Sequence, residues 1–245
     1  MKAALFAVAL ALLIAVELGA PTPEPFDNGS VATAAGRAAR PGCTAEEENT
    51  KLTRPADLLL LEMPDRAIWQ QPDQIMDRLN IADASWVADV GAGSGWFTIR
   101  LSQAVGPRGK VFAEDVQEVM LTAIDRRVRR EGLKNVVITQ GDENSTRLPR
   151  RVLDAVLAVD VYSEVGADKR IAFLRDLADS LKPQGRIGIV NYKPGVGGPG
   201  PCAEDRIPRS IVERDARLAG LPVLTMMDLQ YQYLVVLGSR RAGPS

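Results

Sequence analysis

The stretch from Trp86 to Gly95, WVADVGAGSG, decides the fold. It begins as a short apolar run, typical of a buried β-strand, and ends in glycines at three alternate positions, Gly91, Gly93 and Gly95. A helical pattern follows over residues 94–104. Glycines at a strand-to-helix turn let the backbone bend sharply and approach a ligand, and the next helix N-terminus offers free N–H groups to an anion. The stretch therefore predicts a ligand-binding strand, turn and helix.

Apolar runs and helical patterns alternate along the chain from about residue 56. This alternation predicts a doubly wound α/β fold with a mostly parallel sheet. The last two expected strands are joined by a connection too short for a crossover helix, so we expect them to form an antiparallel pair. The expected strands are residues 86–90, 110–114, 136–139, 152–159, 186–190, 223–227 and 232–237, and the expected helices are 94–104, 117–130, 171–181 and 208–220.

The composition excludes several chemistries. The chain contains no His, so it cannot form a Ser-His-Asp or Cys-His catalytic system or an HExxH zinc site. Its two cysteines are too few for a structural zinc site, and we expect no metal. Lys and Arg number 30 against 31 Asp and Glu, so the basic excess that binds a phosphate backbone is absent and nucleic acid is not an expected partner.

The N-terminus differs in composition from the rest of the chain. Lys2 precedes an unbroken apolar run over residues 3–16. A helix of that length spans roughly 21 Å, less than the roughly 30 Å hydrocarbon layer of a bilayer. The pattern predicts a signal peptide, and hence export to the periplasm or beyond. An uncleaved N-terminal anchor, an apolar helix packed on the domain and a cytoplasmic location remain open.

We therefore expect three parts in the chain. Residues 1–20 would be a signal peptide or N-terminal anchor, residues 21–55 a flexible linker rich in Pro, Gly and Ala, and residues 56–240 the ligand-binding domain. Contact with a membrane is expected only through the N-terminal segment, if it is uncleaved.

Carboxylates follow four consecutive expected strands or lie at their ends: Asp89, Asp115, Asp142 and Asp160. Ligands bind outside the carboxyl ends of the strands in a sheet of this kind, so these side chains should meet at one edge. A single Asp at such a place can simply cap the next helix. Four in order, beside a glycine turn, favour a nucleoside-binding site, in which a carboxylate accepts from the ribose hydroxyls.

The residue after the glycines distinguishes between nucleoside cofactors. A dinucleotide fold prefers a small residue at the sixth place of G-x-G-x-x-G/A, and that place is Trp96 here. A compact turn without a further phosphate cradle favours S-adenosylmethionine, whose only anionic group is a carboxylate.

Five segments in order resemble the motif series of the class I S-adenosylmethionine-dependent methyltransferases, nearest to the group of ubiquinone/menaquinone-biosynthesis C-methyltransferases. The resemblance covers about residues 58–237 and implies a seven-stranded sheet with the last strand antiparallel. The segments are VADVGAGSGWFT, KVFAEDVQEVML, NVVITQGDENSTRLP, LDAVLAVDVYSEV and LKPQGRIGIVNY.

The resemblance implies transfer of a methyl group to a small-molecule acceptor by in-line displacement. The residues that it assigns to the site form three groups. At the acceptor junction, with a catalytic role, it places Asp160 and Tyr162; at the methionine end of the cofactor it places Asp89, Gly91, Ala92, Gly93 and Gly95; at the ribose and adenine it places Asp115, Val116, Asp142 and Glu143.

Two other functions remain open. Relatives often have a His at the place of Ser163, and its absence leaves room for a catalytically inactive module that binds S-adenosylmethionine or another nucleoside. An NAD-dependent oxidoreductase is the third hypothesis, and the bulk of Trp96 at the sixth place of the glycine motif disfavours it.

Three further features have two interpretations each. Trp69 either closes over the cofactor or is a buried structural residue. The arginines within residues 126–130 either bind an anion or form a solvated helix face, which the apolar spacing on the other side favours. The loop of residues 193–201, KPGVGGPGP, is either a substrate lid or a connection.

Overall fold

The protein is represented by a computed structural model that describes residues 62–240. The expected signal or anchor segment, the expected linker and Cys43 lie outside the described residues, so export or anchoring stays a prediction of the sequence. Within residues 62–240, no helix combines the length and the apolar character needed to cross a membrane.

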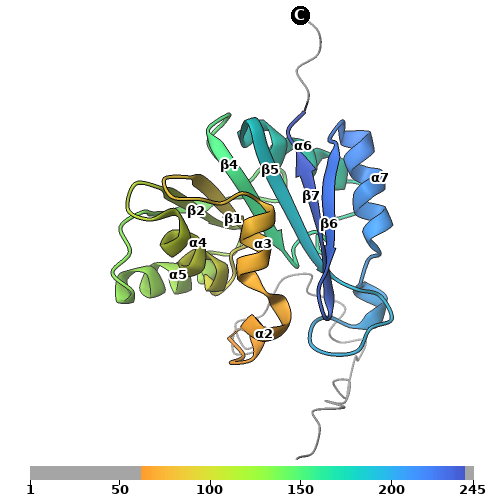
Figure 1. Cartoon of the computed structure of the whole chain (residues 1–245), viewed down its shortest axis with the longest axis horizontal. Helices are drawn as coiled ribbons and strands as arrows, with labels where there is room; N and C mark the ends of the chain where they lie inside the picture. Colours follow the sequence, from red (N-terminus) through yellow and green to blue (C-terminus); the bar gives the residue numbers. More distant parts are fainter. Residues whose placement is uncertain (1–61, 241–245) are drawn as a thin grey trace, which may run out of the picture. The chain divides into compact units, whose positions relative to one another are not determined.

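Seven strands form one mixed sheet in the order β3-β2-β1-β4-β5-β7-β6 (Figure 1). Neighbouring strands from β3 to β5 pair in parallel, while β7 pairs antiparallel with both β5 and β6. The predicted fold class and the antiparallel final pair are therefore confirmed. The strands are β1 (Trp86–Val90), β2 (Lys110–Asp115), β3 (Val136–Gln140), β4 (Leu153–Val159), β5 (Leu181–Tyr192), β6 (Val223–Asp228) and β7 (Gln232–Gly238).

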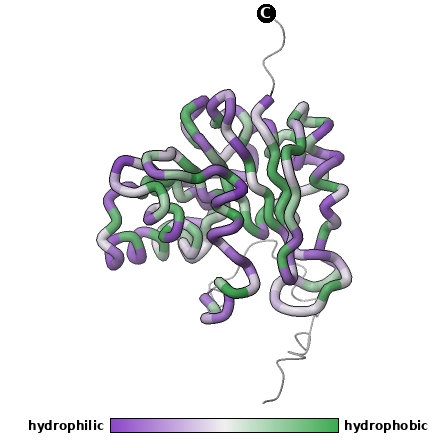
Figure 2. The backbone as a smooth tube through the Cα atoms, in the orientation of Figure 1, coloured by the Kyte–Doolittle hydropathy of each residue, from purple (hydrophilic) through white to green (hydrophobic). Residues whose placement is uncertain are grey.

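Helices cover both faces of the sheet, so the core has two main layers. On one face, α3, α4 and α5 pack on the strands; on the other face lie α6 and α7. Figure 2 shows hydrophobic residues running along the central strands between these layers. The helices are α2 (Arg66–Gln70), α3 (Pro72–Arg78), α4 (Trp96–Val105), α5 (Glu118–Arg130), α6 (Arg170–Ser180) and α7 (Arg209–Ala219), with a short 3₁₀ turn η3 (Ala203–Asp205).

Two elements, α4 and β5, differ from their expected bounds by more than one residue, and each difference has a local cause. The helix α4 begins at Trp96 rather than residue 94, because Gly95 adopts a left-handed φ of 77° as its N-cap. The strand β5 begins at Leu181, earlier than residue 186, and its pairing with β4 shifts register near the start. At Gly185 an added Cβ would lie 2.9 Å from the carbonyl oxygen of Leu153, so this irregular pairing requires a glycine.

The strand order places a switch point between β1 and β4. The chain runs outward from β1 to β2 and β3 on one side, then returns to β4 on the other. The loops after β1 and β4 therefore diverge, which opens a crevice at their carboxyl ends.

We expect the side chains of the central strand β4 to contribute most to the free energy of unfolding. Leu157 on β4 is fully buried, whereas Leu224 on the edge strand β6 is half exposed. We expect Leu157→Ala to lower the free energy of unfolding by about 2–5 kcal/mol, because it leaves a cavity between the sheet and the helices α3 and α4. Leu224→Ala is the matched control and should change it by less than about 1 kcal/mol. Urea unfolding measures both; equal losses would contradict the assignment of the core.

Candidate functional site

The crevice at the switch point is a cleft of about 1300 Å³. Its walls are the carboxyl ends of β1 to β4, the loops that follow them, one residue of α2 and residues of α4, α5 and α6. This edge of the sheet lies toward the end of the molecule where α2 is drawn (Figure 1). Sites for single small molecules usually occupy about 300–1000 Å³, so the cleft is large enough for a cofactor together with a second ligand.

The glycine turn after β1 is held by the acids at the end of β2. Gly91 has a φ of 62°, and an added Cβ would lie 2.1 Å from a methyl carbon of Val161. The Gly91 amide donates to Glu114 Oε2 over 3.4 Å and the Gly93 amide donates to Asp115 Oδ2 over 3.0 Å. These two N–H groups therefore point at carboxylates, while the free donors expected for an anion are those at the N-terminus of the following helix.

Asp89 and Glu114 form the buried floor of the cleft. Asp89 accepts a hydrogen bond of 2.7 Å from the Thr98 hydroxyl of α4, and burial raises its pKa to about 7. Glu114 lines the cleft next to the glycine turn, and burial, opposed by the Gly91 amide, raises its pKa to about 8. Glu114 lies within β2, where the sequence predicted a strand residue, but its role in holding the glycine turn was not predicted.

Asp115 lies where the sequence predicted, with Val116 beside it on the cleft wall. Its Oδ1 accepts from the Gln117 amide over 2.9 Å, while Oδ2 accepts from Gly93. Burial raises the pKa of Asp115, and the backbone donors act in the opposite direction. Each carboxylate oxygen has a second lone pair, so Asp115 can still accept from a ligand hydroxyl.

Asp142 and Glu143 also line the cleft, but both side chains are exposed. Asp142 accepts from the amides of Asn144 and Ser145 and from the Arg147 guanidinium, and these bonds lower its pKa. Glu143 pairs with Lys169 across the rim. The two acids border the rim of the cleft rather than its floor.

Asp160 directly follows β4 and faces the cleft. It has a left-handed φ of 62°, unusual for a residue with a side chain, and its amide donates to the Val190 carbonyl oxygen. Both of its carboxylate oxygens accept from Gln232 Nε2, over 2.8 and 2.9 Å. Burial raises the pKa of Asp160 to about 7, with Arg66 acting in the opposite direction.

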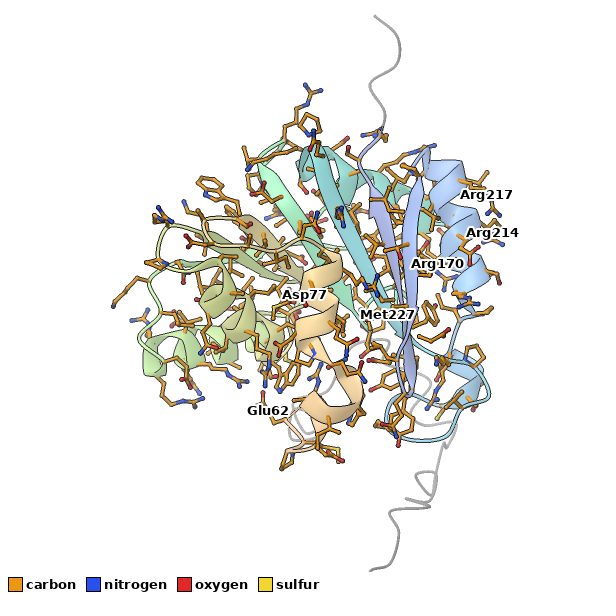
Figure 3. The ribbon with its side chains drawn as sticks, viewed as in Figure 1. Glu62, Asp77, Arg170, Arg214, Arg217 and Met227 are labelled. Atoms are coloured by element: carbon orange, nitrogen blue, oxygen red, sulfur yellow. The ribbon has the colours of Figure 1, made fainter. Side chains whose placement is uncertain are left out.

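The structure does not bring Tyr162 to the cleft. Its side chain is fully buried on the α6 and α7 side of the sheet, 6.3 Å from the Phe173 ring centroid. The hydroxyl donates to Asp215 Oδ2 over 2.9 Å, and burial raises the Tyr162 pKa. Arg214, labelled on α7 in Figure 3, donates to the other Asp215 oxygen. This environment gives Tyr162 a packing role.

Trp69 is a structural residue. It is buried against Tyr192 and Tyr231, with ring centroids 6.2 and 5.9 Å away, and it does not line the cleft. The loop of residues 193–201 is held in place by Arg206, whose guanidinium donates to several of its backbone carbonyl oxygens and lies 5.2 Å from the Tyr192 ring centroid.

The arginines of α5 are mostly solvated, as expected, with one exception. Arg127 packs over the glycine turn, donates to the Ser94 carbonyl oxygen over 3.2 Å and pairs with Glu62, which is labelled in Figure 3. The expected solvated face therefore holds for Arg129 and Arg130 but not for Arg127.

Three further residues line the cleft that the sequence did not assign to the site. Arg66 of α2 is only 7% exposed, and its guanidinium lies 4.3 Å from the Trp96 ring centroid. Glu164 lies on the loop after β4 and also lines the cleft. The Ser94 hydroxyl is buried and has no hydrogen-bond partner within residues 62–240.

The charge of the cleft is unbalanced. In the described part of the chain its lining has three basic side chains, Arg66, Arg147 and Lys169. It has nine acidic ones: Asp89, Glu114, Asp115, Asp142, Glu143, Asp160, Glu164, Asp168 and Asp176. Such a lining attracts cations and repels phosphates.

Sequence comparisons identify relatives for part of the domain. The methyltransferase domain family matches residues 87–185. A demethylmenaquinone methyltransferase of Geobacillus stearothermophilus is 35% identical over 82 residues, 34% of this chain and 35% of that protein. A ubiquinone/menaquinone biosynthesis C-methyltransferase of Saccharophagus degradans is 29% identical over 126 residues, 51% of this chain and 49% of that one. The chain thus spans about a third to a half of these relatives.

Solved structures extend the similarity to the whole domain. An S-adenosylmethionine-dependent methyltransferase from Aquifex aeolicus superimposes with a TM-score of 0.71 at 28% identity, over 76% of this chain and 98% of that one. The [4+2]-cyclase SpnF superimposes with a TM-score of 0.61 at 17% identity, over 72% of this chain and 83% of that one, which shows a shared fold alone.

The strand order, the glycine turn and these similarities agree with one another. Residues 87–185 match the family directly, and the remaining described strands complete the seven-stranded sheet expected of it. The predicted resemblance to the class I S-adenosylmethionine-dependent methyltransferases is confirmed: residues 87–185 match a methyltransferase domain family, and the described domain is similar in fold and sequence to a solved S-adenosylmethionine-dependent methyltransferase.

Proposed function

We propose that the protein binds S-adenosylmethionine in the cleft and transfers its methyl group to a small-molecule acceptor. The observation that carries the proposal is a glycine turn bordered by nine acidic and only three basic side chains. S-adenosylmethionine carries a sulfonium and an ammonium group against one carboxylate, so it suits this lining. The pyrophosphate of a dinucleotide does not.

The residues of the cleft fit the parts of this cofactor. Asp115 would accept from the ribose and Val116 would pack on the adenine, with Asp142 and Glu143 at the rim. Asp89 and the turn of Gly91, Ala92, Gly93 and Gly95 would hold the methionine end. The unpartnered Ser94 hydroxyl supplies one further polar contact that a ligand can satisfy.

When bound, the cofactor supplies a methyl group on a sulfonium leaving group. The chain's own contribution is alignment and the exclusion of water, which can account for a large part of a rate enhancement. Asp160 lies at the end of β4 next to the part of the cleft lined by Glu164. With its pKa near 7, Asp160 can accept a proton from an acceptor that must lose one.

The names of the relatives make a quinone-type acceptor the first to test. A second candidate function is binding without methyl transfer, because a cyclase shares the fold. An NAD-dependent oxidoreductase is disfavoured by the acidic lining and by Trp96, which is buried between the guanidinium groups of Arg66 and Arg100.

Replacement of Asp115 tests the proposal. Asp115→Ala should weaken S-adenosylmethionine binding by about 1.5–3 kcal/mol, because the ribose loses a charged acceptor. Asp125→Ala, on the exposed side of α5 and outside the cleft, is the matched control and should leave the affinity unchanged. Isothermal titration calorimetry measures both dissociation constants. Full affinity in Asp115→Ala, or no binding by the wild type, would refute the assigned site.

The buried acids predict how pH affects binding. The pKa values of Asp89, Glu114 and Asp160 are about 7, 8 and 7 in the folded protein, above those of the unfolded chain. The folded state therefore holds protons that the unfolded chain releases, so ligand-free stability should fall as pH rises from about 5 to 8. A cationic ligand favours the ionised acids, and its affinity should rise from pH 6 to pH 8.

S-adenosylhomocysteine, which lacks the sulfonium charge, is the control ligand for this effect. Its affinity should rise less over the same interval, so the ratio of the two dissociation constants should change with pH. Calorimetric titrations at pH 6, 7 and 8 give the ratio, and a constant ratio would show that the buried acids do not sense the sulfonium.

Tyr162→Phe separates a packing role from a catalytic one. Loss of the hydroxyl leaves the buried Asp215 carboxylate without one donor, so the free energy of unfolding should fall by about 1–3 kcal/mol. Turnover per folded molecule should stay within about twofold, since Tyr162 does not line the cleft. A large loss of turnover at unchanged stability would restore the catalytic role that the resemblance implied.

A further inference from the structure

A line of hydrogen bonds joins α2 to the end of β4. Arg66 Nε donates to Gln70 Oε1 over 2.6 Å, and Gln70 Nε2 donates to Gln232 Oε1 over 2.9 Å. Gln232 Nε2 then donates to both carboxylate oxygens of Asp160. Gln70 and Gln232 are fully buried, so water does not replace these bonds. We call this line the glutamine relay.

The donors of the relay all point the same way, and the chemistry of its ends fixes that direction. An arginine can only donate, so Gln70 must turn its oxygen toward Arg66 and its nitrogen toward Gln232. Gln232 must then present its oxygen to Gln70 and its nitrogen to Asp160. The line ends on both oxygens of the Asp160 carboxylate, which is a stronger hydrogen-bond acceptor when it is ionised.

The relay connects parts of the chain that are far apart in sequence. Arg66 and Gln70 are one helical turn apart on the short helix α2, and Gln232 begins β7. Arg66 and Asp160 both line the cleft. The helix α2 is only five residues long, so its position depends on its contacts with the rest of the domain rather than on its own stability.

We propose that Gln70 and Gln232 are positioning residues that hold Asp160 as an ionised acceptor in the cleft only while α2 is docked on the sheet. A cationic ligand that pairs with Asp160 would therefore tighten the docking of α2, because coupling between two sites is reciprocal. The identity of that ligand, S-adenosylmethionine, rests on the proposed function.

Other charged groups near Asp160 act on it from different elements. Arg66 on α2 and Arg206 on the loop before α7 favour its ionised form. The carboxylate of Glu164 interacts unfavourably with the Asp160 charge, and Tyr233 on β7 senses the same charge. The relay differs from these groups because, among residues 62–240, only the relay runs through direct hydrogen bonds from α2 to Asp160.

Hydrogen exchange at α2 tests the relay in the intact protein. The amides of Ile68 and Gln71 donate within this helix, to Asp65 and Ala67, and report its docking. In the wild type, saturating S-adenosylmethionine should slow their exchange. In Gln232→Leu the exchange should be about five- to tenfold faster, as expected from losing a buried hydrogen bond, and the ligand should no longer slow it.

Two further variants make the test specific. Gln70→Leu should have the same effect, and the double variant should be little worse than either, because both changes break one line. Gln230→Leu, the same substitution on the exposed turn before β7, is the control and should behave as the wild type. If circular dichroism shows that Gln232→Leu does not fold, Gln70→Leu serves as the test variant, because Gln70 lies on α2 and outside the sheet.

The outcomes separate this inference from the proposed function. If calorimetry shows binding but the ligand slows exchange equally in wild type, Gln70→Leu and Gln232→Leu, the relay does not couple the two sites. If the wild type does not bind S-adenosylmethionine, the proposed function fails. Exchange in the ligand-free variants then decides the relay: rates equal to those of Gln230→Leu overturn it, and faster rates support it.

Discussion

The hydrogen bonds from the glycine turn to Glu114 and Asp115 are the constraint on which the cleft depends. They tie the loop after β1 to the end of β2, and they use two N–H groups that a phosphate-binding turn would leave free. The same motif type that receives an anion in dinucleotide folds is here surrounded by negative charge. Local glycine geometry therefore sets the shape of the turn, while the neighbouring strand sets its ligand preference.

Placing these acidic side chains in the cleft lowers the stability of the ligand-free domain. Asp89, Glu114 and Asp160 are removed from water, and desolvation opposes their ionised forms. Few compensating cations lie nearby, with Arg66 the buried one in the cleft lining of the described residues. Such a local conflict is expected at a functional site rather than in a structural core. A bound cation would remove part of the conflict, so stability and ligand binding are linked through the same three carboxylates.

Apolar runs that alternate with helical patterns, the glycine turn and the strand-end acids allowed most of the fold, and the positions of Asp89, Asp115 and Asp160, to be predicted from the sequence. Tyr162 could not be placed this way, because it lies beyond the end of β4 and the left-handed backbone of Asp160 turns the chain just before it. Asp142 is exposed because its carboxylate bonds to its own turn. Arg66 reaches the cleft only through the docking of α2, a contact between distant segments. The pKa shifts depend on burial, which no local pattern records.

The backbone of Asp160 shows how local conformation and contacts from distant strands combine at the cleft. A left-handed φ at a residue with a side chain is unfavourable on its own, and such strain persists only where the surroundings hold it. Here the Val190 carbonyl holds the amide and Gln232 holds the carboxylate. Both partners lie on strands beyond the switch point, β5 and β7, which the motif around the glycine turn does not include. The half of the sheet that carries the glycine motif thus shapes the part of the cleft around the glycine turn, and the other half fixes the position of Asp160.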